Sequence, residues 1–191
     1  MKTNDISIEF PDGRVIPGQL IVGVSEITDF MKGNGTKVPR KTVSTWMSPR
    51  DQNGRPDPLP LGPGGKLARG TVWDLRDIAR WKGFPVPDDP KGPFRVIGAH
   101  RVIGVAEAKT LLDNSGRFVQ YPEGIPRGRI STWGNRFRTT EFPVALRIGP
   151  GGSLSSGSLW DAVEVALWQG PPGRWSQRDP NEGLVDGRAS Y

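Results

Sequence analysis

The chain contains one stretch twice: GPGGKLARGTVWD at residues 62–74 and GPGGSLSSGSLWD at residues 149–161. The glycines, the proline, one leucine and the closing Trp-Asp pair are in register in the two copies. Followed outward, the similarity extends over residues 14–83 and 95–170. Self-similarity over such lengths is typical of a duplicated structural unit. The sequence therefore predicts two copies of one small fold.

The duplication also sets the expected domain organisation. A chain of 191 residues accommodates one or two domains, and the repeat favours two of about 70 residues each. The second copy is longer between residues 107 and 126, where Asn, Ser, Gly and Pro are typical of a surface loop. The expected segments are an N-terminal strand or arm at 1–13, a first repeat at 14–83, a proline-rich linker at 84–94, a second repeat at 95–170 and a flexible C-terminal tail at 171–191.

Each copy carries the signals of three helices and a β-hairpin. A glycine followed three residues later by glutamate marks the first helix, a proline the second and an aspartate the third. These markers are Gly23 with Glu26, Pro39 and Asp74 in the first copy, and Gly104 with Glu107, Pro126 and Asp161 in the second. We expect hairpin strands at Leu59–Leu61 and Ala145–Ile148, each followed by the glycine-rich stretch. The predicted fold class is α+β.

Six of the seven tryptophans occupy equivalent positions in the two copies. A small unit needs a dense core, and large aromatic side chains supply one. The repetition therefore favours core roles for these indoles over stacking on nucleobases. The pairs are Trp46 with Trp133, Trp73 with Trp160, and Trp81 with Trp168.

Composition excludes several classes of site. The absence of cysteine excludes disulfides and thiolate metal sites, and the single histidine leaves no nucleophile and base pair, so we expect no enzyme, metal or cofactor. The glycine-rich run departs from a phosphate-binding P-loop, because Pro60 and Leu67 replace the required Gly and Ser or Thr. No apolar run approaches the ~20 residues of a membrane span, and no secretory signal is recognisable. We expect a cytoplasmic protein.

Positive charge is concentrated in the repeats. The chain carries a net charge of +6, with 12 Lys and Arg against 6 Asp and Glu in residues 14–82, and 9 against 6 in residues 95–169. A basic surface with small polar groups on a helix suits nucleic acid, where cations contact phosphates and polar groups reach base edges. The candidate DNA-contacting residues are Lys37, Arg40, Lys41, Ser44, Thr45, Lys66, Arg69, Arg127, Arg129, Ser131, Thr132, Arg136 and Arg138.

Three motifs carry a resemblance to a known family: Val24-Ser25-Glu26-Ile27, Val43-Ser44-Thr45-Trp46 and the segment from Thr71 to Ile78. Their order resembles the winged helix-turn-helix of the excisionase, AlpA and MerR-like families of bacteria and phages. The resemblance implies two tandem winged-helix domains, each with about three helices and a hairpin wing. It further implies binding to duplex DNA, with the second helix in the major groove. The turn between the first two helices is longer than in that motif, at residues 32–38 and 113–125.

The sequence supports two hypotheses. In the first, the two modules bind adjacent sites on duplex DNA, as a phage or mobile-element transcription regulator or recombination directionality factor. The head-to-tail order is compatible with a direct repeat, and the linker permits other arrangements. In the second, one or both repeats bind a protein partner. Repeat two favours that alternative, because Ser153 and Ser156 replace Lys66 and Arg69.

Overall fold

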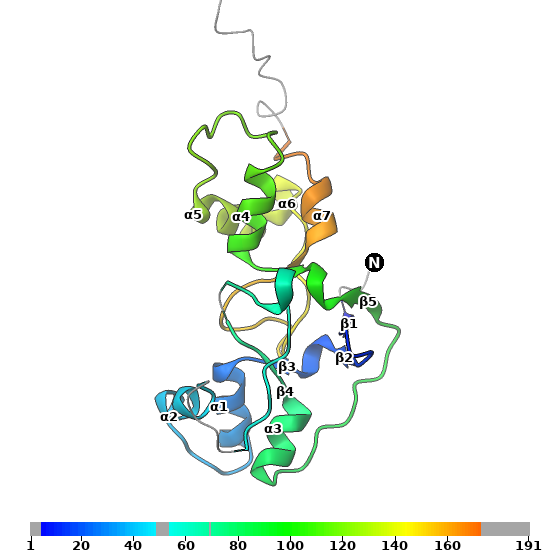
Figure 1. The fold of residues 1–191 in the computed structure, drawn as a ribbon, viewed down its shortest axis with the longest axis vertical. Coiled ribbons are helices and arrows are strands. Elements are labelled where there is room, and N and C mark those ends of the chain that lie inside the picture. The colour runs from blue at the N-terminus through cyan, green and yellow to red at the C-terminus, as the bar shows by residue number, and fades with distance from the viewer. Residues whose placement is uncertain (1–4, 49–53, 69, 173–191) are drawn as a thin grey trace, which may run out of the picture.

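The computed structural model describes residues 5–48, 54–68 and 70–172, and their fold is of the mixed α+β type. The molecule is elongated, with a helical head at each end and a body of short strands between them (Figure 1). Within the described ranges, no helix has the length and hydropathy that a membrane-spanning segment needs.

The two repeats contain similar elements in the same order, and together these form the two heads and the body. The N-terminal segment forms β1 (Ile6–Glu9). The first repeat then comprises β2 (Val15–Pro17), the 3-10 turn η1 (Gly18–Leu20), β3 (Ile21–Val22), α1 (Val24–Gly33), α2 (Arg40–Trp46), η2 (Pro63–Gly65), β4 (Trp73–Asp74) and α3 (Leu75–Lys82). The second comprises β5 (Arg95–Gly98), η3 (Ala99–Arg101), β6 (Val102–Ile103), α4 (Val105–Asp113), α5 (Arg127–Asn135), α6 (Phe137–Thr140), β7 (Trp160–Asp161) and α7 (Ala162–Leu167).

The helix starts predicted from the sequence are confirmed. At the first helix, a glutamate oxygen accepts a hydrogen bond from the N–H of the glycine that precedes the helix, at 3.0 Å in both copies. At the third helix, Asp74 accepts from the N–H of Arg76 at 2.9 Å, and Asp161 from that of Val163 at 3.1 Å. These bonds satisfy N–H groups that lack a partner within the helix.

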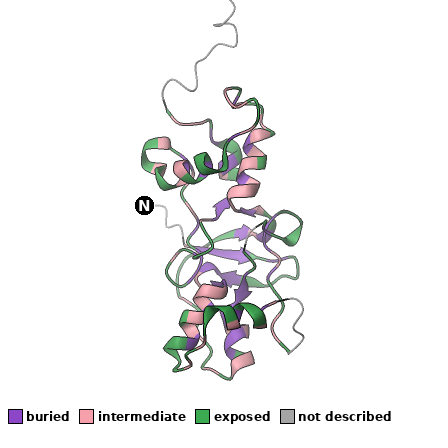
Figure 2. Cartoon of the chain, turned by 90° about the vertical axis from the view of Figure 1, so that its left-hand side faces the viewer, coloured by how far each residue is buried: buried purple, intermediate pink, exposed green. Residues whose placement is uncertain are grey.

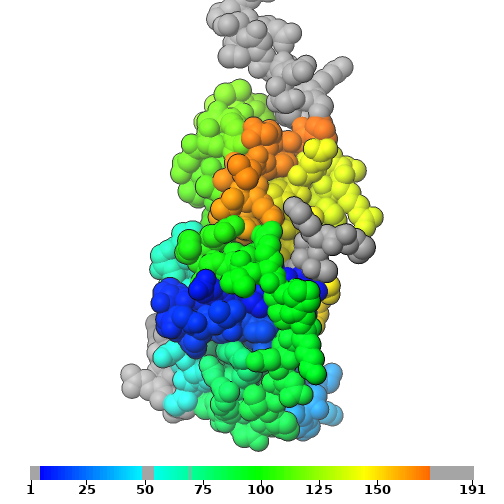
Figure 3. Space-filling view, turned by 90° about the vertical axis from the view of Figure 1, so that its right-hand side faces the viewer, coloured from blue at the N-terminus to red at the C-terminus, as the bar shows by residue number. Residues whose placement is uncertain are grey.

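The body contains a sheet to which both repeats contribute. Strand β1 lies in its centre, antiparallel to β2 of the first repeat and parallel to β5 of the second. Ile8 is paired with Ile16 on one side and with the equivalent Ile97 on the other, and all three are buried. The N-terminal strands and β5 lie side by side on the face shown in Figure 3.

The expected strands at Leu59–Leu61 and Ala145–Ile148 are wrong as regular hairpin strands. Each keeps one backbone bond to its own repeat, from Leu59 to Val72 and from Leu146 to Leu159, both at 2.8 Å. In the first copy the ladder ends because the N–H of Leu61, the next donor on that side, turns back to the carbonyl of Leu59 at 2.9 Å. In both copies the chain then turns toward the other repeat, where Gly62 and Gly149 donate. The glycine-rich stretches are therefore loops packed between the repeats.

Buried apolar side chains form three clusters. One lies in each head, and the third lies in the body and draws on β1, both repeats and both glycine-rich loops. Residues 84–94, predicted as a linker from the sequence, therefore connect two repeats that share one central core. Figure 2 shows buried residues along the strands of the body, between the two heads.

The tryptophans lie where the repeat pattern predicts. Trp73 and Trp160 are buried, and so are Trp133 and Trp168 of the second head. The equivalent residues of the first head, Trp46 and Trp81, are partly buried and meet edge to face with ring centres 6.3 Å apart. The core role predicted for the paired indoles is therefore confirmed, with denser aromatic packing in the second head.

Candidate nucleic-acid interface

Each repeat has a hollow in the same place. It lies between the start of the first helix, the second helix and the end of the glycine-rich loop, with a volume of about 340 Å³ in the first repeat and 460 Å³ in the second. Arg40 and Ser44 line the first hollow, and the equivalent Arg127 and Ser131 line the second. Ser156 lines both, so the two hollows adjoin at the second loop.

Helix α2 presents the predicted polar face of the first repeat. Val43 is buried against the head, while Arg40, Lys41, Ser44 and Thr45 are exposed. The hydroxyl of Thr45 donates to the carbonyl of Lys41 at 3.0 Å, so its proton is used within the helix. Ser44, by contrast, makes no side-chain hydrogen bond to any described residue.

Helix α5 repeats this arrangement in the second head. Ile130 is buried, whereas Arg127, Arg129 and Ser131 are exposed and Thr132 is partly buried. The hydroxyl of Thr132 donates to the carbonyl of Gly128 at 2.8 Å, as Thr45 does in α2. A helical threonine often bonds the carbonyl four residues earlier, so the serines are better placed than the threonines to hydrogen-bond a ligand.

Helices α2 and α5 lie on the same side of the long axis, and α7 lies on the other (Figure 1). The four hollow-lining side chains come from the first pair, so both predicted second helices contribute to one side of the molecule. The structure thus places the two helices that carry most of the sequence-predicted residues on a common side (Figure 1).

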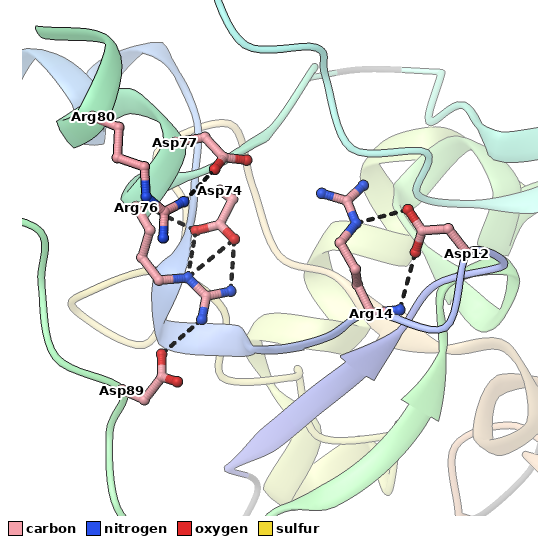
Figure 4. Close-up of polar contacts among 7 residues, drawn as sticks. All are labelled: Asp12, Arg14, Asp74, Arg76, Asp77, Arg80 and Asp89. Carbon is pink, nitrogen blue, oxygen red and sulfur yellow. Dashed lines mark hydrogen bonds and ion pairs between the residues drawn. The ribbon is translucent and has the colours of Figure 1, made fainter.

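Ion pairs divide the cations into two groups. Arg14 pairs with Asp12, and Arg80 with Asp77, both at 2.7 Å (Figure 4). None of these four residues lines either hollow. Other pairs likewise engage cations of the body and of α3 and α4. No cation of α2 or α5 forms an ion pair with a described residue. The charge on these two helices is therefore not neutralised within the described structure.

The remaining predicted cations surround the two helices. Lys37 is exposed in the turn before α2, and Lys66 is exposed in the first glycine-rich loop. Arg136 and Arg138 are exposed at α6, where the guanidinium of Arg138 lies 5.8 Å from the ring centre of Phe137. The prediction for Arg69 lies outside the described residues.

A carboxylate lines each hollow, but its oxygens are already engaged. One oxygen of Glu26 accepts from the N–H of Gly23, and the other accepts from the N–H and the hydroxyl of Ser155 at 2.7 and 2.8 Å. Burial raises the pKa of Glu26, but these hydrogen bonds outweigh it and hold the pKa below its ordinary value of 4.5. The negative charge is thereby directed toward backbone N–H groups rather than toward the open hollow.

Sequence reasoning missed several polar groups of the hollows. Asn135 lines the second hollow, and Thr71 and Ser158 line equivalent places in the two copies. A signal for Asn135 was present, because it follows Ser131 by four residues and so shares its face of the helix. No such signal identified the loop residues, whose position depends on contacts between the repeats.

No protein-family model, curated protein or solved structure matches this chain significantly.

Proposed function

We propose that this protein binds duplex DNA through α2 and α5, with the two hollows facing the sugar-phosphate backbone. The observation that carries the proposal is the pair of exposed, unneutralised basic helices on one side of the molecule, each next to an open hollow. A polyanion gains most from cations that hold no ion pair, since no internal partner has to be given up. The repeats would act as two modules related to the winged helix, as their sequence motifs suggest, with an irregular glycine-rich loop in place of the hairpin wing.

The residue types suit a division of roles in the complex. Arg40 and Arg127, at the start of their helices beside the hollows, are suited to phosphate contacts that fix the position of each helix. Ser44 and Ser131, one turn further along and without internal hydrogen bonds, are suited to contacts with base edges. Regulation of transcription or of recombination direction, in a phage or mobile element, is the biological role that we propose for such a binder.

The decisive experiment compares two double variants with the same change in net charge. Arg40→Ala with Arg127→Ala removes one unpaired cation from each helix, while Arg14→Ala with Arg80→Ala removes two exposed cations held in ion pairs. Fluorescence anisotropy with a labelled duplex should show at least about tenfold weaker binding for the first variant. The second should retain nearly the affinity of the unmodified protein. Equal effects would contradict a role for the two helices.

A second candidate function, contact with a protein partner, is favoured by one observation on repeat two. Val163 and Leu167 of α7 are 45% and 70% exposed, whereas α3 has Arg76 and Arg80 at the equivalent positions. Exposed apolar side chains at helical spacing are typical of a contact surface. Replacing both by serine, which keeps the net charge, should leave DNA affinity unchanged and abolish a partner contact at α7, which cross-linking detects.

A further inference from the structure

The two repeats contact each other reciprocally in the body. The N–H of Gly62 donates to the carbonyl of Ala99 at 3.0 Å, and the N–H of Gly149 donates to the carbonyl of Gly18 at 2.8 Å. Gly149 is the repeat equivalent of Gly62, and Ala99 is that of Gly18. A head-to-tail contact would form only one bond of this kind, whereas a two-fold relation forms both.

The glycine-rich loops repeat this reciprocity. In the first loop, the N–H of Ala68 donates to Glu107 at 2.5 Å, and in the second the N–H of the equivalent Ser155 donates to Glu26 at 2.7 Å. Each loop therefore caps the carboxylate at the start of the other repeat's first helix. The relation between the repeats is the same here as in the body.

Strand direction gives independent support for a two-fold relation. Strands β2 and β5 are repeat equivalents that flank β1, but β2 is antiparallel to β1 and β5 is parallel to it. The two equivalent strands therefore run in opposite directions. A translation would leave them running the same way, while a two-fold axis across the strands reverses one of them. This axis passes near Ile8, which is paired with both equivalents, Ile16 and Ile97.

The two loops meet between the hollows. Gly70 has φ of 83°, and a Cβ atom there would lie 3.1 Å from the Cβ and the Oγ of Ser156, so the two loops are in contact. Ser156 also lines both hollows, which places them on either side of this contact. Helices α2 and α5 thus flank the region where the two equivalent loops meet.

We infer that this single chain recognises an inverted repeat of two related but unequal half-sites, an inference that rests on the proposed DNA binding. A two-fold relation between recognition helices is matched by a pseudo-palindromic site, since each helix then meets its half-site in the same way. Arg40 and Arg127, like Ser44 and Ser131, supply the common contacts. Lys41 is replaced by Gly128, which makes the half-sites unequal. The two-fold relation therefore favours an inverted repeat over the direct repeat that the order of the copies along the chain suggests.

Selection from a random duplex library with the full chain tests the inference. Enrichment of two related half-sites in inverted orientation is the expected result. Enrichment of a direct repeat or of a lone half-site would overturn the inference and leave DNA binding intact. The absence of any enriched sequence and of any retained duplex would overturn the proposed function as well.

Footprinting on the selected duplex provides a second test with single variants. Arg40→Ala should weaken protection over one half-site and Arg127→Ala over the other, at positions related by the dyad of the site. Arg80→Ala, the ion-paired control, should leave both halves protected. Loss of protection at positions related by a translation along the duplex would contradict the inverted arrangement.

Discussion

One carboxylate oxygen of Glu26, at the start of α1, accepts hydrogen bonds from both the N–H and the hydroxyl of Ser155 in the loop of the other repeat. Its second oxygen accepts from the N–H of Gly23. One side chain therefore completes its own helix and holds the opposite loop. Because Glu107 and Ala68 form the equivalent contact, the heads are connected through two matched clamps, which we call the Glu26 and Glu107 clamps.

The Glu26 clamp predicts a defined dependence of stability on pH. Because the pKa of Glu26 is lowered in the folded protein, its contribution is fully present above the ordinary value of 4.5 and is lost as the pH falls through the lower folded pKa. Glu26→Gln should lower the free energy of unfolding by about 1 kcal/mol at neutral pH. Urea unfolding of both proteins should show this difference shrinking below pH 4.5.

The Glu107 clamp provides the matched comparison for that experiment. Glu107→Gln removes the equivalent carboxylate, which accepts from the N–H of Ala68 and of Gly104. Glu107→Gln should reduce stability less than Glu26→Gln, because Ala68 has no hydroxyl to match that of Ser155. Both substitutions should also reduce DNA affinity, because each loosens one loop beside a hollow. A Glu26→Gln protein as stable as the unmodified chain at every pH would contradict the clamp.

Two glycines of α5 predict opposite effects on stability. A Cβ atom at Gly134 would lie 2.6 Å from Cζ2 of the buried Trp160, whereas nothing lies within 4 Å at Gly128. Alanine favours a helix over glycine by up to about 1 kcal/mol, but overpacking a core costs about 1–3 kcal/mol. Thermal unfolding should therefore show Gly128→Ala stabilised and Gly134→Ala destabilised. Two variants with equal stability would contradict this packing.

The buried carboxylate of Asp161 should be essential to the second repeat. Its side chain is fully buried and accepts from Arg95 and Arg101, each at 2.6 Å, as well as from the N–H of Val163. The two arginines are 45% and 37% exposed, so water can solvate them once the carboxylate is removed, and the cost is mainly that of the lost hydrogen bonds to a charged group. Asp161→Asn should therefore lower the free energy of unfolding by about 2 kcal/mol. A loss well under 1 kcal/mol in denaturant unfolding would show that the two arginines contribute little.

The first glycine-rich loop should contact DNA more strongly than the second. Lys66 is exposed without an ion pair among the described residues, and its equivalent is Ser153. Lys66→Ala should weaken duplex binding and reduce the slope of log affinity against log salt by about 1. Ser153→Ala should change neither quantity. Identical salt slopes for Lys66→Ala and the unmodified protein would exclude a phosphate contact by this lysine.

The helices were predictable because their start signals are local. Glu26 and Asp74 satisfy N–H groups within three residues, so sequence neighbours alone determine the contact. The path of the loops was not predictable, because the N–H groups of Ala68 and Ser155 donate hydrogen bonds to glutamates of the other repeat rather than of their own. Two copies with the same loop motif give no indication of which copy each loop will contact.

The candidate site, too, could be predicted from the sequence only in part. The exposed cations of α2 and α5 followed from their position opposite Val43 and Ile130, both of which are buried. The distinction between Ser44 and Thr45 depends on side-chain hydrogen bonds that composition does not specify. The shared side and the adjoining hollows depend on the two-fold packing, which becomes visible only when the contacts between the repeats are known.

The most direct test of the central claim is the salt dependence of duplex binding by the full chain. If about six phosphates are contacted, log affinity should fall with log salt at a slope of roughly −5, a loss of about a thousandfold between 50 and 200 mM salt. The Arg40→Ala and Arg127→Ala double variant should reduce this slope by about 2. An affinity that does not change with salt would contradict the account.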